Sequence, residues 1–412
     1  MLHAPCKFKL LIIKIYNQDI LKKLTLSLII ILSVTNFVVT AQETKEKKKE
    51  RNWTLDGYIS SLQSVIVSDT DYWINDYLLH NRLNFHWYPL KSLTIDIEMR
   101  NRFIYGDQLR LDTSGSYKRS LENDRGLVDL SRNIFQGKSY VLNAMIDRVN
   151  IQYTLKKFEA IIGRQRINWG QTFVWNPNDI FNTYSFFDFD YPERPGSDAI
   201  RLQYYTGTTS AAEFAIKSDS TGNITSAGLF RFNKFNYDIQ LLGGILNSED
   251  LVMGLGWSGN IKNIAFRGEM SYFHPYRDYS DTTGLIYLSV GLDYLFSNSL
   301  YLQFETFYQQ MPAGYNIENF MEFYSGPLSV KNLSFTRYNL FAQASYPISP
   351  LLNGTLAVMY FPEIAGFYLG PSAGYSLTDN LEFSLYLQLF SGKFGNKRQN
   401  FNLAFMRFKY NF

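Results

Sequence analysis

The chain ends in NFNLAFMRFKYNF, residues 400–412, where apolar and polar side chains alternate. Successive side chains of an extended strand point to opposite faces, so one face of this segment is apolar throughout. That face carries Ala404, Met406, Phe408, Tyr410 and Phe412. The same period of two recurs at 93–104 (LTIDIEMRNRFI), 286–296 (IYLSVGLDYLF) and 381–389 (LEFSLYLQL). The pattern predicts many strands, each apolar on one side and polar on the other.

The number of such segments and the spacing between them predict a closed barrel. We expect an all-β fold of about eighteen strands, with sixteen as the alternative, in one transmembrane antiparallel up-and-down barrel over residues 52–412. Short turns are predicted near 89–92, 156–158, 206–209, 233–234, 259–262, 297–299, 347–351 and 378–380. The intervening connections are longer, at about 106–140, 168–197 and 311–336, with intermediate ones near 274–283 and 391–399. Short periplasmic turns and long extracellular loops are typical of barrels in the outer membrane of Gram-negative bacteria.

The composition agrees with a barrel whose outer wall faces lipid. Aromatic residues make up 17% of the 412 residues, a load that is hard to place in an ordinary core, and charged residues only 19%. No apolar run after residue 41 is long enough for a transmembrane helix. In lipid an open sheet would leave unpaired backbone groups at its edges, so the predicted sheet has to close.

The first 41 residues have the pattern of an export leader. Lys22 and Lys23 precede an apolar run from Leu24 to Val39, and Ala41 ends the run with a small residue. This pattern predicts a signal peptide at 22–41 and export through the inner membrane, with a single membrane anchor as the alternative. Residues 42–51 are polar and highly charged, which predicts a disordered periplasmic tail.

Without the leader the chain has no excess of positive charge. The leader contains five of the 40 Lys and Arg residues and one of the 37 Asp and Glu residues, so its removal changes the formal charge from +3 to −1. Nucleic-acid binding by a basic surface is therefore not expected.

Residues 163–205 concentrate arginine and aromatic side chains. A strand with Arg164 and Arg166 on one face precedes an aromatic segment, and the next strand carries Arg201 on its polar face. If the apolar faces meet lipid, all three arginines point into the lumen, as do Arg100, Arg102 and Arg148 by the same parity. Arginines inside a pore favour anions, and the guanidinium group suits carboxylate or phosphate. Pairing with lumen carboxylates that brace the wall is the alternative, and the two roles can coexist.

The segment 168–197 is too rich in aromatic residues for a free surface loop. We expect it to fold inward and to constrict the lumen. Asp179, in the sequence Asn176-Pro177-Asn178-Asp179, is a candidate acceptor for hydrogen bonds from an arginine or from solute hydroxyls. A local turn role for Asp179 is the alternative.

An ordered set of short motifs resembles a known family. Gly163-Arg164-Gln165, Trp169-Gly170 and Arg194-Pro195-Gly196-Ser197-Asp198-Ala199-Ile200-Arg201-Leu202 are similar to the signature region of the alginate-export barrels and related porins. The resemblance implies an eighteen-stranded barrel whose lumen arginines, here Arg164, Arg166 and Arg201, take anionic saccharides or other organic anions. After Trp169-Gly170 the family has a basic residue, where this chain has Gln171-Thr172-Phe173.

The sequence thus predicts a porin-like channel of the cell outer membrane for small hydrophilic, preferentially anionic solutes. The expected partners are outer-membrane lipid and lipopolysaccharide, the solute, and the barrel-assembly machinery, which would recognise strand 400–412. No cofactor, metal or enzymatic activity is expected, because His80 and His86 lie about 20 Å apart on one strand face and no Ser-His-acid order is evident. The alternatives are an export channel for an anionic polysaccharide and a non-conducting structural or enzymatic barrel.

Overall fold

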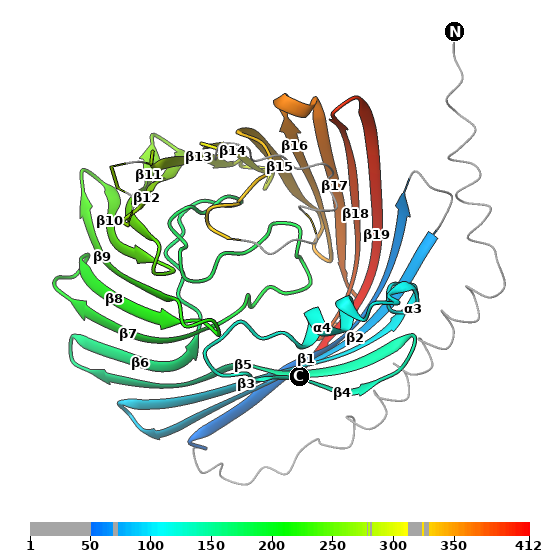
Figure 1. The fold of residues 1–412 in the computed structure, drawn as a ribbon, viewed down its shortest axis with the longest axis horizontal. Coiled ribbons are helices and arrows are strands. Elements are labelled where there is room, and N and C mark those ends of the chain that lie inside the picture. Colours follow the sequence, from blue (N-terminus) through cyan, green and yellow to red (C-terminus); the bar gives the residue numbers. More distant parts are fainter. Residues whose placement is uncertain (1–50, 69–72, 278, 281, 312–323, 325–328) are drawn as a thin grey trace. The chain divides into compact units, whose positions relative to one another are not determined.

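The protein folds into one continuous antiparallel sheet that closes on itself (Figure 1). The computed structural model describes residues 51–68, 73–277, 279–280, 282–311, 324 and 329–412. The predicted signal peptide and most of the predicted tail lie outside these residues. The sheet contains β1 (Trp53–Ser68), β2 (Trp73–Leu90), β3 (Leu93–Gly106), β4 (Ser131–Gln136), β5 (Tyr140–Leu155), β6 (Phe158–Gln165), β7 (Ser197–Tyr205), β8 (Ala211–Ser218), β9 (Ile224–Lys234), β10 (Tyr237–Leu246), β11 (Asp250–Ile261), β12 (Ile264–Pro275), β13 (Leu285–Leu295), β14 (Tyr301–Gln309), β15 (Tyr338–Ser349), β16 (Leu352–Phe361), β17 (Gly366–Ser376), β18 (Leu381–Phe394) and β19 (Lys397–Asn411).

Eighteen of these strands form the barrel. β1 pairs with β2 on one edge and with β19 on the other, which closes the sheet. β4 pairs only with the first part of β5. β6 pairs with the last part of β5 on the same edge, so β4 and β6 together occupy one strand position of the barrel. All other neighbours along the sheet are consecutive strands, apart from the β3–β5 pair. The predicted barrel of about eighteen strands is confirmed.

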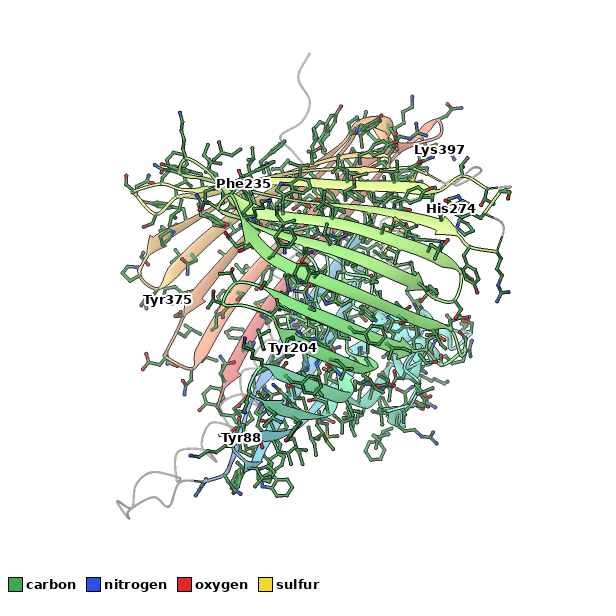
Figure 2. All side chains as sticks on the ribbon, turned by 90° about the vertical axis from the view of Figure 1, so that its left-hand side faces the viewer. Tyr88, Tyr204, Phe235, His274, Tyr375 and Lys397 are labelled. Carbon is green, nitrogen blue, oxygen red and sulfur yellow. The ribbon has the colours of Figure 1, made fainter. Side chains whose placement is uncertain are left out.

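The two ends of the barrel differ in their connections. The end that carries both chain termini of the barrel, called here the turn end, has connections of two to five residues, among them 91–92, 235–236 and 350–351. Phe235 and Asn236 both have positive φ, the conformation of a two-residue hairpin turn whose twist matches the flanking strands. Figure 2 shows Tyr88, Phe235 and Tyr375 towards this end and His274 and Lys397 towards the other.

The opposite end, called here the loop end, carries the long connections. The connection 107–139 contains the helices α3 (Asp107–Leu111) and α4 (Ser116–Glu122) as well as β4, and the connections 166–196 and 310–337 are also long. The predicted alternation is therefore confirmed for these three loops. It is not complete, because β18 and β19 extend to a two-residue connection at 395–396 where a longer one was expected, and the 3-10 helix Pro362–Ile364 lies in a four-residue connection.

The outer face of the wall is apolar between two zones of exposed aromatic side chains. Near the turn end these include Trp87, Tyr204 and Tyr375, and near the loop end Tyr105, Tyr338 and Phe367. Leucine, isoleucine and valine predominate between them, for example Leu241, Ile286 and Leu387. Among the described residues no helix is long and apolar enough to cross a membrane.

A bulge in β5 directs two consecutive charged residues to the inside. The register between β3 and β5 changes at Asp147, so that Asp147 and Arg148 are both buried rather than alternating between the faces. Asp147 accepts a hydrogen bond from the fully buried Arg82 of β2, which also pairs with Glu98 of β3. Three strands are thereby tied together on their inner side.

We predict that Arg82→Ala lowers the free energy of unfolding by about 3–5 kcal/mol, because it leaves the buried Asp147 carboxylate without its counter-charge. Denaturant unfolding of the detergent-folded chain, followed by tryptophan fluorescence, measures the change. Arg110→Ala is the control, since it breaks an ion pair with Asp107 that is largely exposed and contributes at most about 1 kcal/mol. Equal losses in the two variants would contradict this assignment.

Candidate functional site

The connection 166–196, called here the inner loop, folds into the barrel rather than over its rim (Figure 1). It contains no strand or helix. Trp169, Trp175, Ile180 and Phe181 of this segment are almost completely buried. The prediction that this aromatic segment folds inward is confirmed.

Two glutamates of the wall hold the inner loop through its backbone. Glu305 of β14 accepts hydrogen bonds from the N–H groups of residues 173, 174 and 175, at 2.8, 3.1 and 2.8 Å. Glu269 of β12 accepts from the N–H groups of Gln171, Thr172 and Asn178, the last two at 2.8 and 2.9 Å. Neither carboxylate is exposed. Each carboxylate takes the place of the strand partner that these backbone groups lack. The N–H groups are therefore hydrogen-bonded although the loop is buried.

A third carboxylate, Glu213 of β8, links the inner loop to arginines of the wall. Its Oε1 accepts from the indole N–H of Trp169 at 2.5 Å and from Arg201 at 2.8 Å. Its Oε2 accepts from Arg201 and Arg231, both at 3.0 Å. Two cations around one buried carboxylate leave a net positive charge at this point of the lumen.

Aromatic side chains fill the lumen between the inner loop and the strands β13–β18. Trp175 stacks on Phe307 at 5.5 Å between ring centroids, and Phe186 meets Phe341 edge to face at 5.2 Å. A second inward segment, residues 329–336, brings Phe335 to within 4.7 Å of Phe361. Only a void of about 20 Å³ remains between the two segments. This side of the lumen is therefore closed by a packed core.

A larger space remains on the other side, next to β1 and β19. This space, called here the side cavity, has a volume of about 430 Å³. Its wall is formed by Leu62 and Phe405 of the barrel, by Tyr324, and by residues 183–185, 187–191, 194 and 195 of the inner loop. Asp188, Asp190 and Arg194 are the charged residues that line it. The side cavity thus lies between the inner loop and the strands β1 and β19.

Four of the predicted arginines lie on the inner face of the wall. Arg201 is bound to Glu213, and Arg148 donates to the carbonyl oxygens of residues 193 and 194 of the inner loop, at 2.8 and 2.6 Å. Arg100 donates to Nε2 of His80 and lies 3.8 Å above the ring of Tyr191. Arg102 donates to Asn143 and to the carbonyl of residue 121, at the end of α4. These side chains brace the wall and the inner loop.

The structure differs from the prediction at Arg164. The register pairs Arg201 with Ile161, so Arg164, three residues further along β6, faces the opposite side and not the lumen. There it is buried under the segment 124–130 and bound to Asp124 at 2.5 Å and Asp198 at 2.6 Å. It also donates to the carbonyl oxygens of residues 128 and 146. Arg164 therefore fills the interval in the wall between the end of β6 and the start of β4.

Arg166 also differs, because β6 ends at Gln165 and Arg166 belongs to the inner loop. Its guanidinium lies 6.0 Å from the ring centroid of Tyr184, and its Nε has no hydrogen-bond partner. The predicted common strand face of Arg164 and Arg166 does not exist.

Asp179 belongs to the inner loop, and its side chain is buried. Its Oδ1 accepts a 3.3 Å hydrogen bond from the N–H of Trp169, and its Oδ2 has no partner. Burial raises the pKa of Asp179 to about 8, and the nearby Glu269 contributes in the same direction. A carboxyl buried within the inner loop is not placed to contact a solute.

The sequence did not single out Glu213 or Glu305. Parity places both on the inner faces of β8 and β14, as it does for any inward polar residue. Their partners in the inner loop lie 130 or more residues away for Glu305 and 44 away for Glu213, so strand spacing alone cannot reveal the anchoring role.

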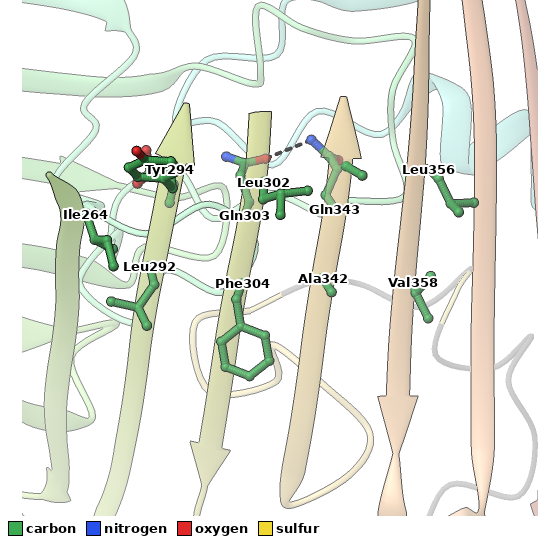
Figure 3. Close-up of a pocket in the computed structure, with 12 residues that line it drawn as sticks. Ile264, Leu292, Tyr294, Leu302, Gln303, Phe304, Ala342, Gln343, Leu356 and Val358 are labelled. Atoms are coloured by element: carbon green, nitrogen blue, oxygen red, sulfur yellow. Dashed lines mark hydrogen bonds between the residues drawn. The ribbon is translucent and has the colours of Figure 1, made fainter. Parts of the chain in front are cut away.

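A second hollow, of about 440 Å³, lies on the outer face and is not part of the lumen site. Figure 3 shows its side chains on adjacent strands from β12 to β16, where the small residue Ala342 lies between Phe304 and Val358. The hydrogen bond between Gln343 and Gln303 belongs to the inner side of the same strands. The wall here is apolar outside and polar inside.

We predict that Glu305→Ala releases residues 173–175 from the wall, because three backbone N–H groups lose their acceptor. Amide hydrogen exchange of this segment should accelerate by about tenfold or more, while exchange in the strands stays unchanged. Glu363→Ala is the control, since Glu363 accepts from one exposed N–H at the loop end. An unchanged rate of amide hydrogen exchange at residues 173–175 would show that the packing of the aromatic side chains alone holds the inner loop.

Burial of Asp179 predicts a dependence of stability on pH. The pKa of the Asp179 carboxyl is about 4 in the unfolded chain and about 8 in the folded chain. As the pH rises from 4 to 8, the unfolded chain therefore releases its proton first, and the free energy of unfolding falls. The difference in unfolding free energy between the wild type and Asp179→Asn should therefore shift in favour of the variant from pH 4 to pH 8. Chemical unfolding at several pH values measures it, and a constant difference would contradict the prediction.

No protein-family model matches the sequence, and no curated protein matches it either. The resemblance of residues 163–202 to the alginate-export barrels thus has no support from a family match.

Solved structures do share the fold. OccK11 (OpdR) of Pseudomonas aeruginosa is 8% identical with a TM-score of 0.55, and the alignment covers 87% of this chain and 96% of that one. OccAB1 of Acinetobacter baumannii is 9% identical with a TM-score of 0.55, covering 90% and 100%. The outer membrane protein opdK of Pseudomonas aeruginosa is 10% identical with a TM-score of 0.54, covering 87% and 98%. At these identities the likeness establishes the fold: this chain is a closed antiparallel barrel of the same architecture.

Proposed function

We propose that this chain is a porin-like channel of the outer membrane, through which small hydrophilic solutes diffuse, and that it is not an enzyme. The observation that carries the proposal is a closed eighteen-strand barrel whose lumen is narrowed, but not filled, by the inner loop. The fold shared with opdK, an outer membrane protein, supports the location. The apolar outer face between two aromatic zones is what a lipid-facing barrel requires.

The proposed route passes through the side cavity. The inner loop is anchored to β12 and β14 and packed on β13–β18, so the proposed passage lies beside β1 and β19, where the side cavity is found. A cavity of about 430 Å³ has the size of a pocket for a small organic molecule. The channel is accordingly selective by size.

The preference for anions is the second part of the proposal. It is supported by Arg100, Arg102, Arg148 and Arg166, for which no carboxylate lies within ion-pair distance in the described part of the chain. Positive charge in the lumen is therefore not cancelled pair by pair. Asp188 and Asp190 of the inner loop oppose this preference locally.

The proposed partners follow from the location. Lipid and lipopolysaccharide would cover the outer face, the leader would direct export, and the strand 400–412 would engage the barrel-assembly machinery. In the folded barrel this strand pairs with β1 and β18.

An export channel for an anionic polysaccharide finds less support. A polymer needs a continuous wide passage, whereas two inward segments close the lumen along β13–β18. A conductance measurement distinguishes the proposed channel from a non-conducting barrel.

Conductance in a planar bilayer tests the proposal. The folded chain should give a small, steady conductance, with a reversal potential in a KCl gradient that indicates anion preference. Glu269→Ala/Glu305→Ala should increase the conductance severalfold, because the inner loop loses the acceptors for six of its backbone N–H groups. Glu249→Ala/Glu363→Ala, which removes two carboxylates from the loop end, is the matched control. A correctly folded barrel without conductance would overturn the channel, and a cation-directed reversal potential would overturn the anion preference alone.

A further inference from the structure

Two of the three charged residues that line the side cavity are acidic, Asp188 and Asp190, and the third is Arg194. Asp188 is exposed to the cavity, and its carboxylate has no ion pair or hydrogen bond in the described part of the chain. Asp190 lies next to it, with its Oδ2 at 3.6 Å from Nδ1 of His80 and without a hydrogen bond. Two carboxylates are thus left without a guanidinium partner.

The arginines around the cavity are already engaged. Arg194 donates to the carbonyl oxygen of Ser185 at 3.1 Å and lies 3.7 Å above the ring of Tyr184. Arg100 is held between His80 and the ring of Tyr191. Their planar faces and several donors are directed to the protein, so they are less available to a solute than the two carboxylates.

Aromatic rings form the walls of the cavity. Phe189 is fixed by stacking on Tyr386 at 4.2 Å and by edge contact with Phe405 at 4.7 Å. Phe187 packs on Tyr368 at 5.1 Å. The rings therefore have defined positions before any solute enters, and an aromatic face attracts a cation as well as apolar groups.

We propose that the side cavity is a binding site for an organic ammonium group with an apolar body. Asp188 and Asp190 supply the negative charge, and the rings of Phe187, Phe189 and Phe405 contact the apolar part. This inference adds a solute class to the proposed channel function. It rests on that function only for the route by which the solute reaches the cavity. Together with an anion preference of the whole lumen, such a site selects zwitterions over simple anions.

Isothermal titration calorimetry of the folded, detergent-solubilised chain tests the site without requiring conductance. Benzyltrimethylammonium should bind, and tetramethylammonium, which lacks the ring, should bind more weakly. Benzoate has the same ring with the opposite charge and should show no binding in the same concentration range. Asp188→Asn/Asp190→Asn should weaken benzyltrimethylammonium binding by about tenfold or more.

Two controls keep the outcome unambiguous. Glu249→Gln/Asp379→Asn removes the same number of negative charges at exposed positions outside the cavity and should leave the affinity unchanged. Asp188→Asn alone alters a side chain without partners, so its fold is preserved and it should reproduce part of the loss. Benzoate binding as tightly as the ammonium compound, or unchanged affinity in both Asn variants, overturns the site. Ammonium binding by a barrel that does not conduct leaves the site in place and removes the channel.

Discussion

Six backbone N–H groups of the inner loop donate to two carboxylates of the wall, those of Glu269 and Glu305. A chain segment without strand or helix cannot lie buried unless its peptide groups find partners, since each unpaired group costs about 1–3 kcal/mol. The packing of Trp175 on Phe307, the closure of one side of the lumen and the position of the side cavity all follow from this anchoring. Each carboxylate in turn accepts three backbone hydrogen bonds, which offset part of the cost of its burial.

The charges of the lumen serve mostly to hold the wall and the loop together. Arg82 unites three strands, Arg164 replaces a missing piece of strand, and Arg148 supports the inner loop at its carbonyl oxygens. Guanidinium groups suit this work because they donate several hydrogen bonds in fixed directions. The abundance of arginine is thus a poor guide to the charge that a solute meets, which depends on the groups left without partners.

The strands could be predicted from the sequence because each one follows a period of two, and the turn end because its connections are short. The positions of individual charges were harder to predict. Parity assigned Arg201 to the correct face, but the strand with Arg164 ends one residue later, at Gln165, and its facing depends on the pairing of Ile161 with Arg201. At Asp147 a bulge breaks the alternation. The role of Glu305 depends on residues about 130 positions away, and no local pattern contains that information.

The packed core inside the barrel also affects how strongly the register of β16 with its neighbouring strands is specified. In most strands a shift of one residue would turn polar side chains into lipid, and this cost fixes the register. Over the loop-end half of β16, Ala357, Met359 and Phe361 face inward while Val358 and Tyr360 face outward, so both faces are apolar. A shift there carries little penalty, and the correct alignment depends on the polar turn-end residues Asn353 and Thr355. Assembly accuracy in this part of the wall is therefore set by the first few residues of the strand.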